Sequence, residues 1–398
     1  MPTPFDAIVL GAGPAGATAA LLLARAGWSV ALVEKTEFPR RKVCGEFLSA
    51  TNLPLLRELG LGERFLDIAG PDVRRVAIFA GSKTVVSDMP RLGSDRHGWG
   101  HALGREHLDT MLVEQATTMG ACVFQPYTAS ELRRSGGSYE CAITGGDTRV
   151  IRARVVIAAH GSWDHNELRT LPARRPARPG DLFGFKARFV GTRLPPGLMP
   201  LLTFPGGYGG MVHSDNGLVS LSCCIRRDWL ARSRREAPGL PAGDAVLRHI
   251  TRHCAGARDA LSDARLEDHS WRSAGPIRPG IRGTRCDGIF LVGNAAGEAH
   301  PVVAEGISMA MQSSWLLVRR LLETEAAGKH IDDAAHTYSR DWTRAFAWRI
   351  HAAALIAHWA MHPAAVALTV PLLRAFPRML TASARQTGKV SALCSPSC

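Results

Sequence analysis

Phe5-Asp6-Ala7-Ile8-Val9-Leu10-Gly11-Ala12-Gly13-Pro14-Ala15-Gly16 is the stretch that decides the fold. Its first half is a short apolar run typical of a buried parallel strand. Its second half is a glycine turn that leads into an Ala/Leu-rich helix ending near Ala26-Gly27, and a second strand is expected over 29–34. This order of strand, glycine turn, helix and strand is the order of a dinucleotide-binding βαβ unit.

The residues of the turn have separate tasks in such a unit. Gly11 permits the tight turn, Gly13 lets the backbone approach a pyrophosphate, and Gly16 lets helix and strand pack closely. Pro14 and Ala15 open the helix, whose N-terminal amides and partial positive charge attract phosphates. The alternative, a glycine-rich turn without a ligand, does not explain why all these features occur together.

Glu34 strengthens the prediction because it closes the second strand. A carboxylate at this offset accepts hydrogen bonds from ribose hydroxyls, and it would repel a 2′-phosphate. We therefore expect a dinucleotide without a 2′-phosphate, with Glu34 and the adjacent Lys35 among the residues that contact it.

A second glycine-bearing segment lies nearly 280 residues further along the chain. It reads Gly288-Ile289-Phe290-Leu291-Val292-Gly293-Asn294-Ala295-Ala296-Gly297, followed by His300-Pro301 and Glu305-Gly306-Ile307. By itself this segment predicts only a strand, a turn and a long helix from about residue 306. Together the two motifs resemble those of FAD-dependent oxidoreductases of the para-hydroxybenzoate hydroxylase fold, in the geranylgeranyl-reductase-like branch.

This resemblance implies FAD as the cofactor. The family carries an acidic residue at Asn294, where it binds a ribityl hydroxyl, and a glycine at Ala304. An asparagine side chain can still bind a hydroxyl, and the helix that follows faces the flavin pyrimidine. The candidate FAD-binding residues of this segment are Gly293, Asn294, Pro301, Glu305, Gly306 and Ile307.

Further matches extend the resemblance over most of the chain. Phe38-Pro39-Arg40-Arg41-Lys42-Val43-Cys44-Gly45-Glu46 is similar to the loop that lies beside the flavin in the reductase branch. Arg105 matches the arginine that reaches the phosphate and ribityl region of the cofactor. The other cofactor-binding candidates from these segments are Arg41, Lys42, Cys44, Gly45, Val123 and Gly161.

Three residues are candidates for catalysis. Cys44 is expected to lie against the flavin as a tuning group or proton donor, or to be a packed thiol. His300 either orients substrate and acts as an acid or base, or bonds to the backbone. Tyr208 lies in Phe204-Pro205-Gly206-Gly207-Tyr208-Gly209-Gly210, which resembles the glycine–tyrosine strand near the substrate cavity of the reductase branch. For Lys186 we favour a position facing solvent over one facing the cavity.

The fold class expected from these patterns is α/β, with a Rossmann-type FAD-binding domain, an antiparallel substrate lobe and C-terminal helices. Helices are expected over 52–67 and 104–120, and strands at 123–124 and 154–159. Residues 1–170 and 270–330 should form a discontinuous FAD-binding domain, with parts of the substrate lobe inserted at about 70–100. Residues 171–269 should form the lobe, 331–385 the helices and 386–398 a flexible tail.

Composition excludes several classes of protein. The net charge of +13 invites a nucleic-acid interpretation, but 42 of the 48 basic residues are scattered arginines and no nucleic-acid-binding motif occurs. Nine cysteines without a CxxC pair give neither a zinc site nor a disulfide framework. We expect no metal, no nucleic-acid partner and a cytoplasmic location.

Residues 352–373 are apolar, but His358, His362 and Pro363 interrupt them before the ~20 residues that a membrane span needs. A packed helical hairpin is therefore favoured over a membrane-associated apolar surface, which remains open as a peripheral membrane or lipid contact. The oligomeric state is left open.

The resemblance implies a flavin monooxygenase that hydroxylates an apolar aromatic or lipid-like substrate through a flavin C4a-hydroperoxide. A geranylgeranyl-type reductase of isolated C=C bonds and a non-catalytic FAD-binding protein are the alternatives. NADPH or NADH is the candidate electron donor, although His160 replaces the aspartate that helps to place the pyridine nucleotide in hydroxylases.

Overall fold

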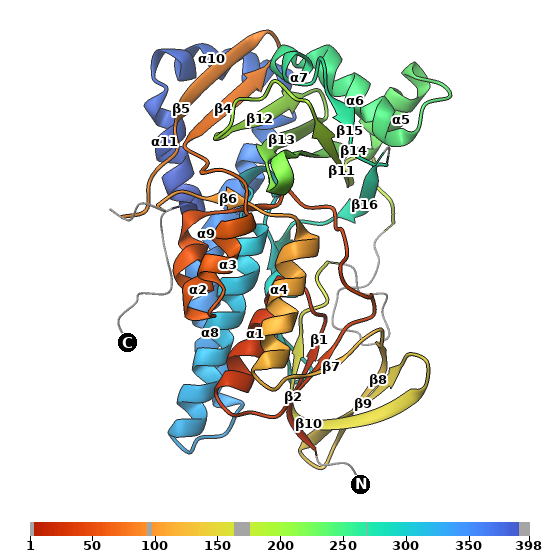
Figure 1. The fold of residues 1–398 in the computed structure, drawn as a ribbon, viewed down its shortest axis with the longest axis vertical. Coiled ribbons are helices and arrows are strands. Elements are labelled where there is room, and N and C mark those ends of the chain that lie inside the picture. The colour runs from red at the N-terminus through yellow and green to blue at the C-terminus, as the bar shows by residue number, and fades with distance from the viewer. Residues whose placement is uncertain (1–3, 94–97, 163–175, 269, 390–398) are drawn as a thin grey trace.

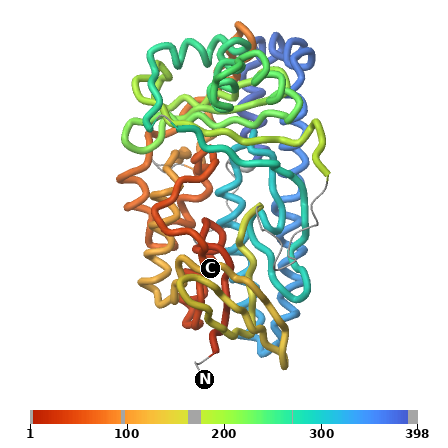
Figure 2. Tube along the Cα trace, turned by 90° about the vertical axis from the view of Figure 1, so that its right-hand side faces the viewer, coloured from red at the N-terminus to blue at the C-terminus, as the bar shows by residue number. Residues whose placement is uncertain are grey.

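The computed structural model describes residues 4–93, 98–162, 176–268 and 270–389. Two large sheets lie at opposite ends of the long axis of the molecule, and long helices connect them (Figure 1). Figure 2 shows the same division from the side, with the N-terminus at the end that carries the first sheet.

The first sheet is built around β1 (Phe5–Leu10). β1 pairs in parallel with β2 (Val30–Val33) on one side and with β10 (Thr148–Ala158) on the other. β7 (Cys122–Phe124) continues the sheet beyond β2, and β19 (Ile289–Leu291) continues it beyond β10, both in parallel. β1 and β2 are largely buried, which explains their continuous apolar sequences.

β10 is longer than the expected strand at 154–159 because its first half has a separate partner. Residues 148–153 pair with β9 (Ser138–Thr144), which forms a hairpin with β8 (Thr128–Ser135). β18 (Arg285–Cys286) pairs antiparallel with β19 at the other edge. Exposed and buried residues alternate in β10 from Val150 to Arg154, whereas the last four residues of the strand are all buried.

Three helices cover the first sheet. α1 (Pro14–Arg25) contacts both α4 (Arg105–Thr118) and α8 (Gly306–Ala326), as Figure 1 shows. The helix expected over 52–67 is instead two helices, α2 (Leu53–Glu58) and α3 (Gly62–Ile68). The break falls at Gly60, whose φ of +75° does not continue a right-handed helix.

The second sheet has strand order β15-β11-β14-β13-β12-β4-β5, with β16 also paired to β11. Its pairs are antiparallel except for β12 with β4. The strands are β4 (Arg75–Ala80), β5 (Lys83–Asp88), β11 (Leu182–Val190), β12 (Leu198–Phe204), β13 (Gly207–His213), β14 (Val219–Arg226), β15 (Arg265–Leu266) and β16 (Arg272–Ile277). The short helices α5 (Arg227–Glu236), α6 (Ala242–His253) and α7 (Ala255–Ala260) lie beside this sheet.

The C-terminal helices connect the two sheets. α9 (Asp333–Ala360) packs along α8, and α10 (Pro363–Ala375) and α11 (Arg378–Ala384) pack on β4 and β5. In the described part of the chain no single helix is long and apolar enough to cross a membrane; α9 and α10 pass that test only as a pair, bent by 103°.

Residues Arg385–Lys389 form a π-helical turn in which Thr387 is buried. The expected flexible tail at 386–398 overlaps this turn, and its part from 390 on lies outside the described residues. The α/β class, with a parallel nucleotide-type unit, a largely antiparallel second sheet and C-terminal helices, is confirmed.

The remaining short elements join these parts. They are β3 (Phe47–Leu48), β6 (His101–Ala102), β17 (Gly280–Ile281), β20 (Gly297–Glu298), η1 (Ala50–Asn52), η2 (Asp215–Gly217), η3 (Gly293–Ala295) and η4 (Pro301–Val303).

Gly16 gives a direct test of the packing in the first unit. A Cβ atom at Gly16 would lie 1.8 Å from the carbonyl oxygen of Gly11, which is backbone and cannot rotate away. We predict that Gly16→Ala lowers the free energy of unfolding by about 3 kcal/mol, measured by urea denaturation. Gly146→Ala is the control, since a Cβ there meets no atom within 4 Å; equal stability of the two variants would contradict the packing described.

Candidate FAD site

A single cavity of about 1790 Å³ runs from the glycine turn to the C-terminal helices. Typical ligand pockets have volumes of about 300–1,000 Å³, so this one has room for a dinucleotide and a second molecule. Its two ends differ in chemistry. Charged and glycine residues line the first end, namely Gly11, Gly13, Glu34, Arg40, Lys42 and Arg105. Apolar residues line the second, namely Met199, Leu201, Met211, Val212, Trp359 and Leu372.

The glycine turn has the geometry that the sequence predicts. Gly11 has a φ of +100°. Gly13 is the N-cap residue of α1 and, as a glycine, has no side chain that could cover the helix N-terminus. Gly13, Pro14 and Ala15 line the cavity, whereas Gly16 is packed beneath the turn. The positive end of α1 is therefore presented to the cavity, as phosphate binding requires.

Glu34 lies at the end of β2 and is buried. Its carboxylate accepts hydrogen bonds from the backbone N–H of Ala12 at 2.9 Å and of Thr36 at 3.0 Å, and from Arg40 at 2.7 Å. Because Glu34 also lines the cavity, it both holds the glycine turn in place and offers carboxylate oxygens to a ligand. The adjacent Lys35 is exposed at the cavity edge.

Two guanidinium groups stand over Gly13. A Cβ at Gly13 would be 3.6 Å from Nη2 of Arg105 and 4.0 Å from Nη2 of Arg40. Asp109 holds Arg105 through two hydrogen bonds, of 2.6 and 2.7 Å. Arg105 was expected here, but Arg40 was not singled out as a contact, although it lies in the loop motif.

The basic cluster fits an anionic cofactor. The pKa of Lys42 is lowered, first by burial and then by the neighbouring positive charge of Arg40. Among the residues that the structure describes, the buried Nε of Arg40 has no hydrogen-bond partner. A bound pyrophosphate would relieve this crowding of positive charge, so the residues present fit FAD at this end of the cavity.

The second predicted segment closes the cavity from the other side. Asn294 lines it, and its side-chain amide donates to Ser162 Oγ at 3.0 Å and to Glu298 at 3.2 Å. Pro301, Gly306 and Ile307 also line the cavity. Sequence reasoning missed Glu298, a buried carboxylate of the cavity wall that pairs with Arg282 at 2.9 Å.

Ala304 adopts a left-handed conformation with a φ of +51°. This is the position where the family motif has glycine, which takes that conformation without strain. The backbone therefore keeps the family's turn despite the methyl group. Gly293 is left-handed as well and packs against Ala15, and Glu305 is buried near Ser49 Oγ, so neither lines the cavity.

Cys44 and Tyr208 line the cavity, as do some but not all of the other residues predicted from the sequence. Arg41, Gly45 and Gly161 line it, whereas Val123 lies in β7 away from it, and Tyr127 occupies the wall nearby. His300 is not a wall residue. Instead, its Nδ1 lies 3.3 Å from the hydroxyl of Tyr208.

Cys44 lies where the loop meets the second sheet. The backbone N–H of Glu46 approaches its Sγ at 3.4 Å, and Ser222 of β14 donates to its carbonyl oxygen at 2.8 Å. Burial by itself lowers the pKa of Arg105, but Asp109 and then the Cys44 thiol beside it raise this pKa overall. Cys44 is thus fixed between the basic cluster and the apolar part of the cavity.

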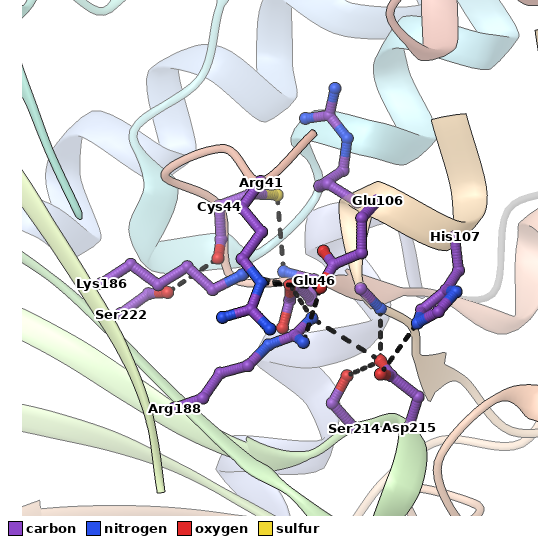
Figure 3. A network of polar contacts seen from close by, with 12 residues as sticks. Arg41, Cys44, Glu46, Glu106, His107, Lys186, Arg188, Ser214, Asp215 and Ser222 are labelled. Carbon is purple, nitrogen blue, oxygen red and sulfur yellow. Dashed lines mark hydrogen bonds and ion pairs between the residues drawn. The ribbon is translucent and has the colours of Figure 1, made fainter. Parts of the chain in front are cut away.

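The expectation that Lys186 faces solvent is wrong. Lys186 is 3% exposed, and its ammonium group is paired with the carboxylate of Glu46 (Figure 3). The neighbouring Arg188 bonds the same carboxylate at 2.8 Å. Alternate residues of a strand share a face, and this face of β11 is covered by the loop that contains Glu46 rather than by water.

The pair extends into a buried ion-pair network of Glu46, Glu106, Lys186, Arg188 and Asp215. Arg188 also reaches Glu106 at 2.6 Å and Asp215 at 3.7 Å. Asp215 in turn accepts the N–H of Gly104, just before α4, at 2.7 Å. The network therefore joins the cofactor loop, the start of α4 and the second sheet, as Figure 3 shows.

Glu46 has an unusual backbone conformation and a shifted side-chain pKa. Its φ of +61° is unusual for a residue with a side chain. Burial by itself raises the pKa of Glu46, but the charges of Lys186 and Arg188 outweigh it and lower the pKa overall. The carboxylate is therefore ionised at neutral pH.

The fold and this site are those of a flavoprotein, with a Rossmann-type unit whose glycine turn and basic cluster face one large cavity. The chain belongs to the FAD-binding-domain family, whose family model (FAD_binding_3) matches residues 5–354. FAD is accordingly its cofactor.

Two proteins of known name are similar to this chain in sequence. Menaquinone reductase of Mycobacterium tuberculosis is 27% identical over 414 residues, covering 98% of this chain and 88% of the relative. Conditioned medium factor receptor 1 of Dictyostelium discoideum is 28% identical over 80% of this chain. The match covers only 63% of that receptor, less than two thirds of its length.

Solved structures share the fold. The myxobacterial chondrochloren halogenase CndH superposes with a TM-score of 0.79 at 22% identity, covering 96% of this chain and 91% of the halogenase. PqsL, described as "a probable FAD-dependent monooxygenase from Pseudomonas aeruginosa", gives a TM-score of 0.75 at 17% identity, covering 93% of this chain and 100% of PqsL.

A substitution at Gly13 should weaken binding of the cofactor without affecting the folding of the protein. A methyl group at Gly13 would point into the cavity at ordinary contact distance, so we predict that Gly13→Ala keeps the thermal unfolding midpoint of the FAD-free protein. The same methyl group would occupy space next to the pyrophosphate, and we expect a tenfold or greater loss of FAD affinity, about 1.4 kcal/mol or more. Fluorescence titration of the FAD-free protein with FAD measures this; unchanged affinity would contradict the proposed position of the pyrophosphate.

Glu46→Gln tests the buried network. Removing this charge takes from the buried Lys186 its ion-pair partner and leaves Arg188 with Glu106 and Asp215 alone. We expect a loss of about 3–5 kcal/mol of unfolding free energy at pH 7. Because the folded state lowers the pKa of Glu46, its contribution is present above the ordinary carboxyl pKa and is lost as the pH falls through the folded-state value. The difference between wild type and variant should therefore shrink in acid.

Glu58→Gln is the matched control, because Glu58 pairs with Arg25 at the surface with both side chains 40% exposed. Such pairs contribute about 0–1 kcal/mol. Urea denaturation of the three proteins between pH 7 and pH 3 makes the comparison. If the two variants were equally stable at pH 7, the network would not stabilise the fold.

Proposed function

We propose that this protein is a flavin-dependent monooxygenase that hydroxylates an apolar aromatic or lipid-like substrate. The observation that carries the proposal is the continuity of the cavity, which joins the basic, glycine-lined end to an apolar chamber. A substrate in that chamber would lie directly against the cofactor, without a layer of solvent between them. The likeness in fold to PqsL and to the halogenase supports the same class of chemistry.

FAD, when bound, supplies electrons that NADPH or NADH provides in our proposal, and passes them to oxygen or to substrate. The protein's part is to hold the cofactor and to shape the chamber. Gly13, Arg40 and Arg105 would hold the phosphates and Glu34 a ribose. Cys44 and Asn294, which both line the cavity between its two ends, would contact the flavin portion.

The chamber is suited to oxygen transfer because mainly apolar side chains line it. Where solvent reaches the site, oxygen is released as hydrogen peroxide and the substrate is not hydroxylated. Exclusion of solvent therefore favours hydroxylation. Burial raises the pKa of Tyr208 well above its usual range and lowers that of His300 to about 4. The Tyr208–His300 pair is therefore uncharged at neutral pH and can orient a substrate without ionising.

A reductase of C=C bonds is the second candidate, and the position of Cys44 favours it. Addition of hydrogen across a double bond needs a proton donor beside the substrate, and Cys44 is one of the residues that line the cavity. The similarity to menaquinone reductase over 98% of the chain also supports this candidate.

Oxygen labelling distinguishes the two candidates. We predict that the FAD-loaded protein, NADPH or NADH and an apolar aromatic substrate give a product that contains one ¹⁸O atom when the reaction runs under ¹⁸O₂. Mass spectrometry of the product is the measurement. A product that gains hydrogen without ¹⁸O would identify the reductase, and the absence of turnover with either donor would favour an FAD-binding protein without catalysis.

Cys44→Ser and Tyr208→Phe refine the assignment in the same assay. Under the monooxygenase proposal, Cys44→Ser keeps the incorporation of ¹⁸O into the product. Tyr208→Phe removes the hydroxyl that is paired with His300, and it should therefore raise KM for a substrate that already carries a hydroxyl group. Loss of all turnover in Cys44→Ser with normal FAD content would support the reductase instead.

A further inference from the structure

The outer face of α10 is apolar along its whole length. The exposed residues of α10 and its C-cap recur at helical spacing, and Arg374 is the one polar residue among them: Pro363, Ala364, Ala367, Leu368, Pro371, Leu372, Arg374, Ala375 and Phe376. Leu368 is 81% exposed and Phe376 60% exposed. The inner face, with Val366 and Val370, packs on the second sheet. A helix that is apolar on both faces normally has a partner on each.

The charges around this face are positive. Arg374, Arg378 and Arg385 lie on α10, on α11 and directly after it, and all three are exposed. No Asp or Glu occurs anywhere from residue 342 to 398 of the sequence. The strands beneath add Arg75 and Lys83 against the single carboxylate of Asp88. Exposed apolar residues with flanking arginines are the composition of a helix that lies in an anionic membrane surface.

The cavity reaches the same face. Leu372 and Met379 line the cavity and are 49% and 46% exposed, so they stand at its opening. The wall behind them is apolar, with Trp359, Leu373 and Leu380. Trp359 is fixed to α10 by a 2.7 Å hydrogen bond from its indole N–H to Thr369.

We propose that α10 and α11 form a docking surface for an anionic lipid bilayer, and that the cavity takes up its apolar substrate from that bilayer. The apolar face would lie among the acyl chains and headgroups, with the arginines paired to lipid phosphates. The uptake of substrate rests on the proposed function, whereas the docking itself does not. Vesicle binding and catalysis can therefore fail independently.

Vesicle flotation with the FAD-loaded full chain tests the docking. Wild type is expected to float with vesicles of phosphatidylcholine that contain phosphatidylglycerol, and much less with phosphatidylcholine alone. Ala364→Gln/Leu368→Gln should abolish flotation with both. Arg374→Gln/Arg378→Gln should lower the affinity for the anionic vesicles by about tenfold or more, and raised salt should act in the same direction.

Matched controls lie elsewhere on the surface. Leu240→Gln removes a leucine that is 43% exposed beside α6, and Arg234→Gln/Arg235→Gln removes two exposed arginines of α5; both should bind vesicles like wild type. Retained FAD absorption in every variant shows that the fold is intact. Equal flotation of Ala364→Gln/Leu368→Gln and wild type would overturn the proposal.

Light scattering without lipid tests whether a second copy of this chain, rather than a bilayer, binds to this face. If wild type is a dimer that Ala364→Gln/Leu368→Gln converts to a monomer, and neither protein floats, α10 is an interface between two copies and the proposal is wrong. Turnover of a detergent-dispersed substrate should be unchanged in this variant, because Ala364 and Leu368 do not line the cavity.

Discussion

The buried carboxylate of Glu46 is the contact on which the rest of the site depends. It holds Lys186 and Arg188 of β11 against the loop that carries Cys44 and Lys42. Charges this deeply buried cost free energy unless they are compensated. Because they are compensated only when the loop lies on the sheet, the network fixes the relative position of the two halves of the molecule. In that position, residues of both halves line one cavity.

The glycine turn supplies the second constraint, and it acts locally. The close approach of Gly16 to Gly11 sets α1 on β1 and presents the helix N-terminus to the cavity. Glu34 then ties the end of β2 to the turn through the Ala12 amide. Cofactor binding is thus built from contacts near in sequence, whereas the substrate chamber is built from contacts far apart in sequence.

This difference explains how much the sequence could predict. The βαβ unit, Glu34 and Arg105 follow from local pattern and family motif, and the α/β architecture was predicted correctly. The left-handed turn at Ala304 was not predicted, although the glycine that the family carries there is the signal that could have indicated it. The break at Gly60 was missed because the apolar spacing continues across it.

The errors fall where distant segments meet. Lys186 was expected in solvent because the pattern of β11 cannot show that a loop 140 residues away covers its second face. Glu298 was missed for the same reason, since Ser162, which bonds to it, lies 136 residues earlier in the chain. Arg40 was missed although its partner Glu34 is only six residues away, because the loop motif offers Arg41 and Lys42 as well. Val123 has the expected secondary structure but lies off the cavity wall, because the wall there is formed by the residues that follow β7.

The central claim is that FAD and an apolar substrate occupy one continuous cavity. The most direct measurement is a titration of the FAD-loaded protein with an apolar aromatic ligand, followed by the absorption spectrum of the flavin. The account predicts one FAD per chain and a saturable spectral change, because the ligand would contact the flavin ring. A protein that does not retain FAD, or a ligand that binds without perturbing the flavin spectrum, would contradict it.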